Sequence, residues 1–338
     1  MSKITPLFVL LLLLHLGAHA QPKAGAGAFT YSAPKVIARQ NGIRLEGTTE
    51  TPARINSPQL SVVAPTIAFD LGAKTISQVR ANGGVALKLN VAATDKAAKT
   101  YVEAKADSAI LTTANRTLEL VGHLSGFYQL GEGGKNTLSG DRANLSFAAG
   151  SFLADVENPT LQIPAETISR ADALGELRVS AKRGQVDQSS GSATFSGNAH
   201  AQSVGGTNAF DLTAPAFTIA RGTDGTISTL TTKGKTAVKY DLPPDPKPIT
   251  DTKTLGTPTH VEVTSNSATF DRATGKATFS GDVRGFYRLD SSAGQRDYKF
   301  SGDQATISFN SAAASTQAGL NVEVTGAPVQ ISAPGFEF

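Results

Sequence analysis

Four aspartates recur at corresponding places in the chain, and a recurring carboxylate is a candidate for general acid or base catalysis. They are Asp141, Asp187, Asp271 and Asp303. Asp187 and Asp271 each open a short polar stretch that ends in glycine, which is typical of a turn. The other two each lie in a Ser-Gly-Asp step. Because an active site is rarely copied at every hairpin, we interpret all four as turn residues and predict no catalytic residue.

Metal and phosphate chemistry are also poorly supported. The chain has no cysteine, and the three histidines that follow residue 20 lie far apart in the sequence: His123, His200 and His260. Transition-metal sites need clustered His and Cys ligands at short spacings. Residues 234–236, Gly-Lys-Thr, resemble the end of a phosphate-binding loop, but Thr229 replaces its first glycine and a strand-like segment follows. The sequence therefore predicts no metal, no cofactor and no enzymatic activity.

The remaining candidate chemistry is the binding of an apolar ligand. In residues 117–130 and 276–289 every second residue is apolar or glycine, a period typical of a strand with one apolar face. Both stretches are longer than usual strands and long enough to lie along an acyl chain. The predicted lipid-binding residues on this inner face are Leu118, Leu120, Leu124, Tyr128, Phe279, Val283 and Tyr287. A closed sandwich core explains the same alternation.

Four glycines share this inner face, where side-chain volume would normally be expected: Gly122, Gly126, Gly281 and Gly285. Glycine within a strand marks a bend or the close approach of another backbone. On the opposite face, Arg284 and Arg288 are candidates for contact with headgroup phosphates, although solvated charge on the outer face is the favoured explanation.

The composition favours an all-β protein with many turns, because 33 glycines accompany abundant Thr, Ser and Val, and tryptophan is absent. The formal net charge of +3 comes without a stripe of Lys and Arg, so we predict no nucleic-acid partner. Residues 1–20 read as a cleavable secretory signal, with one charge at Lys3, an apolar core and a small-residue cleavage site. Residues 21–27 are expected to be a flexible N-terminal segment.

An internal repeat organises the rest of the chain. Residues 102–130 align without a gap on residues 261–289, and residues 138–147 match 300–309 after a three-residue insertion. We predict two tandem homologous β units, residues 28–172 and 173–338, the second with a Pro-rich loop at 241–258. A hairpin recurs inside them, so stacked antiparallel hairpins should form an elongated β-jellyroll or slab.

Three segments of the second unit carry a resemblance to a known family: Ser267-Ala-Thr-Phe-Asp271, Lys276-Ala-Thr-Phe-Ser-Gly-Asp-Val283 and Phe300-Ser-Gly-Asp-Gln-Ala-Thr-Ile-Ser-Phe309. This pattern resembles the OstA-like (LptA) family of periplasmic lipopolysaccharide-transport proteins. The likeness is clearest over residues 261–310 and 102–148 and fades toward residues 21–80. The chain departs from the simplest members in having two units and the Pro-rich insert.

The resemblance implies a jellyroll that is open along one side and shields acyl chains inside. It also implies partners that bind by edge-strand pairing, namely inner- and outer-membrane components of a lipid export bridge, and head-to-tail self-association. We therefore expect a non-enzymatic periplasmic protein that carries or bridges lipopolysaccharide, or a similar amphipathic glycolipid, toward the outer membrane. The alternative is a structural or adhesive cell-surface β-repeat protein with a packed core.

Overall fold

The computed structural model describes residues 30–72, 76–92, 99–131, 133–148, 151–168, 175–206, 208–222, 225–241, 257–291, 294–310 and 319–332. The predicted signal at 1–20, the segment 21–27 and residues 242–256 of the Pro-rich loop lie outside these ranges. Strands dominate the described chain, with one short helix, α2 (Ala165–Ile168), which confirms the predicted all-β class of stacked antiparallel strands. The described part contains no helix long and apolar enough to cross a membrane.

The chain divides into two compact units. Unit 1 runs through Pro159 and includes Gly184–Gly191, and unit 2 comprises Thr160–Arg183 and the chain from Ser192 onward. The strands of unit 1 are β1 (Thr30–Ser32), β2 (Lys35–Arg39), β3 (Gly42–Glu46), β4 (Ala53–Asn56), β5 (Leu60–Ala64), β6 (Thr66–Leu71), β7 (Ile76–Val91), β8 (Thr100–Thr112), β9 (Thr117–Leu130), β10 (Asn136–Ala148), β11 (Ser151–Glu157) and β14 (Arg183–Asp187), the last from Gly184.

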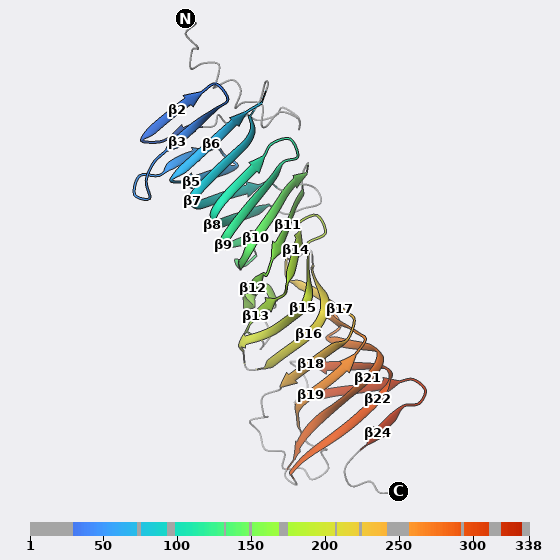
Figure 1. Ribbon diagram of the computed structural model, residues 1–338. Helices are drawn as coiled ribbons and strands as arrows, with labels where there is room; N and C mark the ends of the chain where they lie inside the picture. The colour runs from blue at the N-terminus through green and yellow to red at the C-terminus, as the bar shows by residue number, and fades with distance from the viewer. Residues whose placement is uncertain are drawn as a thin grey trace, which may run out of the picture. The chain divides into compact units, whose positions relative to one another are not determined.

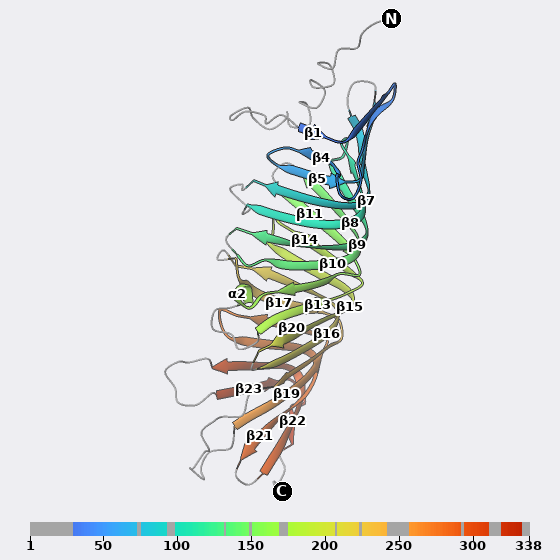
Figure 2. The same ribbon diagram turned by 90° about the vertical axis from the view of Figure 1, so that its left-hand side faces the viewer.

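The long strands of unit 1 each belong to two ladders, which we call wall A and wall B. Residues 76–82 of β7 pair with β6 in wall A, and residues 86–89 pair with β5 in wall B. Strands β8, β9 and β10 follow β7 in the same way and lie side by side in Figures 1 and 2. Wall A also contains β2, β3 and β11, and wall B also contains β1 and β4.

A bulge in each long strand makes the corner between the two walls. The pairing register shifts at this point between β7 and β8, between β8 and β9, and between β9 and β10. Bulges bend a strand and allow it to leave one sheet for another. Positive φ angles, which favour Gly, Asn, Asp and His, occur in four corner pairs: Gly83-Gly84, Gly122-His123, Gly197-Asn198 and Gly281-Asp282.

The corner predicts an effect of substitution at Asn198, an exposed residue with φ of 58°. A β-branched side chain is disfavoured in this left-handed region, so we expect Asn198→Val to lower the free energy of unfolding by about 1–2 kcal/mol. Asn198→Gly, which keeps the backbone accessible, should remain close to the unaltered protein. Urea denaturation measures both, and equal stability of the two variants would show that the bulge does not require positive φ.

Unit 2 is built in the same manner. Its strands are β12 (Thr160–Ile163), β13 (Gly175–Ser180), β15 (Ser192–Gly205), β16 (Ala209–Arg221), β17 (Ile227–Lys233), β18 (Thr236–Asp241), β19 (Thr257–Ser265), β20 (Ser267–Asp271), β21 (Lys276–Ser291), β22 (Gly294–Asn310), β23 (Gly319–Thr325) and β24 (Gln330–Ser332). Strands β15, β16, β21 and β22 bend at the corner. Wall A of this unit also contains β17, β20 and β23, and its wall B also contains β12, β13, β18, β19 and β24.

In each unit most of the described side chains that point between the walls are apolar, with a few buried polar residues such as Asn136 and Thr236 among them, whereas charged side chains point outward. In wall B of unit 2, for example, the buried Val238 pairs with the buried Val263, while the next residues, Lys239 and Glu262, form an ion pair at 3.2 Å. This alternation follows from the two-residue period of a strand. The interior of each unit is therefore an apolar layer between two walls.

Candidate functional site

The structure places the seven predicted lipid-binding residues on the inward faces of the two units. Leu118 and Leu120 lie in wall A of unit 1, and Leu124 and Tyr128 lie in wall B after the corner; all four are buried. In unit 2, Phe279 of wall A and Val283 of wall B are buried, and Tyr287 of wall B is half-buried. The structure therefore places four of these residues in the interior of unit 1 and three in the interior of unit 2.

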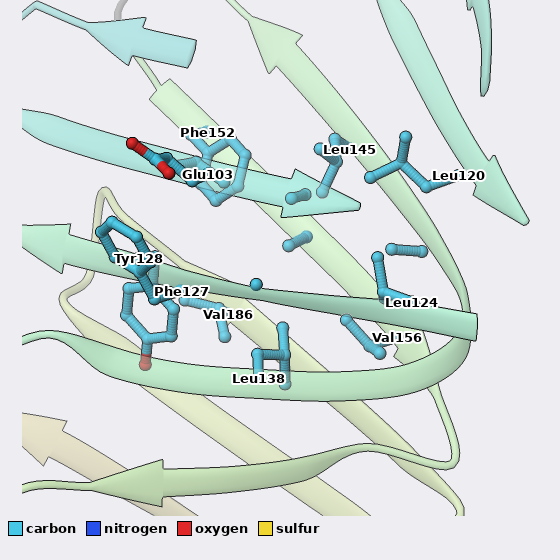
Figure 3. Close-up of a pocket in the computed structure, with 15 residues that line it drawn as sticks. Glu103, Leu120, Leu124, Phe127, Tyr128, Leu138, Leu145, Phe152, Val156 and Val186 are labelled. Carbon is cyan, nitrogen blue, oxygen red and sulfur yellow. The ribbon is translucent and has the colours of Figure 1, made fainter. Parts of the chain in front are cut away.

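A small cavity of about 40 Å³ lies between the walls of unit 1 (Figure 3). Three of the predicted residues line it, namely Leu120, Leu124 and Tyr128. The other lining residues come from β8 to β11 and β14: Val102, Glu103, Ala104, Gly126, Phe127, Leu138, Ala143, Leu145, Phe152, Ala154, Val156 and Val186. Both walls contribute, so the cavity marks the contact layer between them.

The sequence analysis did not predict several of the lining residues, because the alternation of inward and outward positions in β10 is interrupted. Leu138 and Leu145 both face inward, but the corner of β10 holds the single residue Asp141, opposite two residues of β9, and the inward positions of β10 change parity there. In β9 the corner contains two residues, Gly122 and His123, so the alternation resumes unchanged. The structure pairs Leu145 with Leu118 and so places them on one face, but the alternation within β10 carries no signal of this pairing.

The cavity is far smaller than a ligand site. Sites for small molecules usually measure about 300–1,000 Å³, whereas this cavity, at about 40 Å³, has room for a few waters at most. Leu120, Leu124 and Tyr128 therefore touch other side chains across most of their surface in this conformation. An acyl chain would enter only if the two walls moved apart.

The glycines on the inward face have separate structural reasons. Gly122 and Gly281 adopt positive φ at the corners, where the strand bends. Gly126 and Gly285 lie where a neighbouring backbone comes close: a Cβ on Gly126 would lie 2.1 Å from the carbonyl oxygen of Glu103, and one on Gly285 would lie 2.7 Å from that of Glu262. A bend and the close approach of another backbone, the two effects expected of a glycine within a strand, therefore both occur.

Ionisable groups form matching rows on the outer face of wall B. In unit 1, Lys88 Nζ lies 3.0 Å from Glu103 Oε1, and Tyr101 donates a hydrogen bond to the same carboxylate. These two contacts hold the pKa of Glu103 below its ordinary value. Unit 2 repeats the arrangement with Lys239 and Glu262. These charges are paired with one another outside the apolar interior.

Both candidate phosphate-binding arginines also lie on the outer face of unit 2. Arg284 is paired with Asp282, at 3.1 Å. Arg288 makes two hydrogen bonds to Asp297, of 2.7 and 3.1 Å, and this guanidinium holds the pKa of Asp297 below its ordinary value. The carboxylates thus neutralise both side chains in the described structure.

The recurring aspartates take part in turns and corners. Asp187 accepts hydrogen bonds from the backbone amide and hydroxyl of Ser189, and Asp271 accepts one from the amide of Ala273. Asp141 accepts from Asn158, and Asp303 accepts from the amide of Ala327. Within the described ranges, no three His, Asp or Glu side chains are grouped so that they could hold a metal ion.

The histidine at the corner of β9 has a raised pKa. His123 is exposed, and its Nδ1 lies 2.8 Å from Asp107 Oδ2. The hydrogen bond to Asp107 and the charges of Asp107 and Asp141 raise the pKa of His123 above its ordinary value. Because the folded pKa is the higher one, this stabilisation is fully present below the unfolded pKa and is lost as the pH rises through the folded pKa.

We expect Asp107→Asn to move the pKa of His123 down toward its ordinary value, because the substitution removes the charge nearest to the ring. An NMR titration of the imidazole resonances measures this, with Asp155→Asn, on β11, as the control. A pKa of His123 that stays the same in Asp107→Asn would show that the ion pair does not form in solution.

No protein-family model and no curated protein sequence matches the chain. Among solved structures, the crystal structure of LptH from Pseudomonas aeruginosa, described as the LptA homologous periplasmic component of the conserved lipopolysaccharide transport device, is similar to part of it. The alignment covers 44% of this chain and 94% of that chain, with 13% sequence identity and a TM-score of 0.28. A similarity at this TM-score does not establish a shared function.

Proposed function

We propose that the protein is a non-enzymatic, periplasmic lipid-binding protein that carries or bridges lipopolysaccharide, or a similar amphipathic glycolipid, toward the outer membrane. The observation that carries the proposal is the apolar layer between two walls, to which Leu120, Leu124 and Tyr128 belong. The residue pattern shared with the OstA-like family supports the same substrate class. The interior would cover acyl chains at roughly 25 cal/mol per Å² of buried apolar surface.

The construction of each unit supports opening along one side. The walls share their backbone at the corner, where the strands pass from one wall to the other. On the opposite side the strands end, as at the turn from residue 112 to residue 117 in wall A of unit 1. We call this side the seam. Separation of the walls at the seam breaks apolar contacts and leaves the described ladders intact.

We further propose that partners bind at the sheet edges. Exposed large apolar residues occur on the outermost strands: Tyr31 on β1 and Val36 on β2 in unit 1, and Ile331 on β24 in unit 2, which is 67% exposed. An unpaired strand edge accepts a further strand through its free N–H and C=O groups. Membrane components of a lipid export bridge, or a second copy bound head to tail, fit this mode of assembly.

We also propose that the chain contains two homologous units and that residues 1–20 are a secretory signal. Equivalent cross-strand pairs support the duplication, since Ala104 pairs with Gly126 in unit 1 and Val263 pairs with Gly285 in unit 2. A duplication would supply two lipid-accepting interiors in one chain, residues 28–172 and 173–338.

The second candidate function is a structural or adhesive β-repeat protein of the cell surface. The small volume of the cavity, about 40 Å³, favours this candidate, because a filled interior needs no ligand. The two functions differ in one property: a carrier must open its walls to a lipid under native conditions.

The test is the lipid content of protein purified without detergent, measured by native mass spectrometry and lipid extraction, followed by binding of purified lipopolysaccharide. Ala104→Val should fill the cavity and weaken this binding about tenfold, equivalent to about 1.4 kcal/mol. The matched control is Lys105→Val, the exposed neighbour of Ala104, and circular dichroism verifies folding of both. A lipid-free protein that also fails to take up added lipopolysaccharide supports the structural repeat.

A further inference from the structure

The interior of unit 2 is aromatic at ladder positions where that of unit 1 is aliphatic. Phe279 lies two residues before the corner glycine of β21, as Leu120 does in β9, and Phe300 pairs with Gly285 as Leu138 pairs with Gly126. The aromatic set is Phe195, Phe210, Phe217, Phe270, Phe279 and Phe300, in place of Leu45, Leu60, Ile67, Leu111, Leu120 and Leu138. The reverse exchange occurs at Phe69 and Ile219.

Two of these rings join the walls of unit 2. Phe210 points inward from wall B, in line with the buried Leu212, and Phe270 points inward from wall A, in line with the buried Ala268. Their ring centroids lie 5.7 Å apart at an interplanar angle of 88°. Phe270 also meets Phe279 edge-on, at 5.9 Å and 85°. This T-shaped geometry is the favoured arrangement for aromatic pairs.

The contact between Phe210 and Phe270 lies at the seam. Phe270 is the next-to-last residue of β20, before the turn to β21, and Phe210 is the second residue of β16. Both rings are half-buried, whereas Phe279, nearer the corner, is 1% exposed. The two rings therefore stand between solvent and the deeper interior of unit 2.

A polar group next to these rings, the side chain of Asn208, favours separation of the two walls. Asn208 donates a hydrogen bond of 2.6 Å to the hydroxyl of Tyr240, the cross-strand partner of Phe210. The other amide atom, Asn208 Oδ1, is buried and has no hydrogen-bond partner among the described residues. A buried acceptor without a donor costs free energy that hydration recovers. Separation of the walls at this point would admit water to Asn208. The contact between the two rings therefore holds the walls together against the free energy that hydration of Asn208 would gain.

We propose that Phe210 and Phe270 form an aromatic latch that determines whether the interior of unit 2 admits an acyl chain. The inference rests on the proposed lipid-binding function and assigns the two rings a role in selecting which interior fills. With the latch closed, the aliphatic interior of unit 1 accepts lipid more readily than the interior of unit 2. Loss of either ring frees the seam of unit 2.

A distance measurement tests the latch without lipid. The chain contains no cysteine, so Ala209→Cys and Thr274→Cys introduce two spin labels on exposed positions at the two sides of the seam. Electron paramagnetic resonance should show a longer, broader distance distribution in Phe210→Ala and Phe270→Ala than in the unaltered protein. Phe286→Ala, which removes a ring from the outer face of wall B, is the control. An unchanged distance in both latch variants overturns the latch.

Photo-crosslinking then tests admission of the acyl chain. A benzophenone amino acid replaces either Tyr128 in unit 1 or Tyr287 in unit 2, and purified lipopolysaccharide is the probe. We expect a stronger adduct at 128, and a several-fold rise at 287 alone when Phe210 or Phe270 is replaced by alanine. Adducts at 128 with no change at 287 overturn the latch but leave lipid binding intact. Absence of adducts at both positions in every variant overturns the proposed function, and the role of the latch in acyl-chain admission with it.

Discussion

Replacing Phe279 by alanine should lower the free energy of unfolding by about 4 kcal/mol, the cost typical of removing a buried phenylalanine ring. Phe279 is 1% exposed and pairs with Ala268 and Ala305 in wall A of unit 2. Its small neighbours cannot fill the space that the ring would leave, and the edge-on contact with Phe270 would also be lost. Urea denaturation followed by circular dichroism measures the change.

The control for this prediction is Phe286→Ala. Phe286 lies on the same strand but on the outer face, half-buried against His260 at 5.4 Å between ring centroids. Its removal leaves no internal cavity, so we expect a loss well below that of Phe279→Ala. Similar losses in the two variants would mean that the region between the walls is not the core of unit 2.

Gly126→Ala should destabilise unit 1 by about 3 kcal/mol or more, although it adds a single methyl group. The new Cβ would lie 2.1 Å from the carbonyl oxygen of Glu103 and 2.9 Å from the Cα of Ala104. Both atoms belong to the backbone of β8, so no change of rotamer relieves the overlap and the β8–β9 ladder must part. The lost stability is measurable by thermal and urea denaturation.

Ser125→Ala is the matched control for Gly126→Ala, because Ser125 is the preceding residue of β9 and is exposed. A surface substitution of this kind stays within about 0.5 kcal/mol of the unaltered protein. If Gly126→Ala were as stable as Ser125→Ala, β8 and β9 would have to be farther apart in solution than the structure places them.

Alternation in the sequence predicted β9 and β21 and their inward faces because the corner adds two residues to each strand. Leu120 and Leu124 keep the same parity on both sides of Gly122 and His123. The same reasoning fails in β10, where the corner holds the single residue Asp141 and the parity of the inward positions reverses. The number of residues in a bulge depends on the pairing with the neighbouring strand, which the periodicity of one strand does not contain.

The sequence predicted a slab of stacked hairpins, but which side chains of the two walls meet, and the cavity between them, were beyond it for a related reason. Phe152 of β11 and Val186 of β14 complete the cavity with residues of β9 that lie tens of positions away. Short strands of this kind show weak periodicity, and only the ladder places them opposite Leu124. The contact of Phe210 with Phe270 is likewise set by how the walls face each other.

The most direct test of the central claim is a photo-crosslinking scan along β9 with purified lipopolysaccharide. A benzophenone amino acid is placed in turn at the inward positions Leu124 and Tyr128 and at the outward positions Ser125 and Gln129. Lipid held between the walls predicts adducts from 124 and 128 and none from 125 and 129. Adducts of equal yield at all four positions, or at none of them in a folded protein, would contradict an apolar interior that accepts lipid.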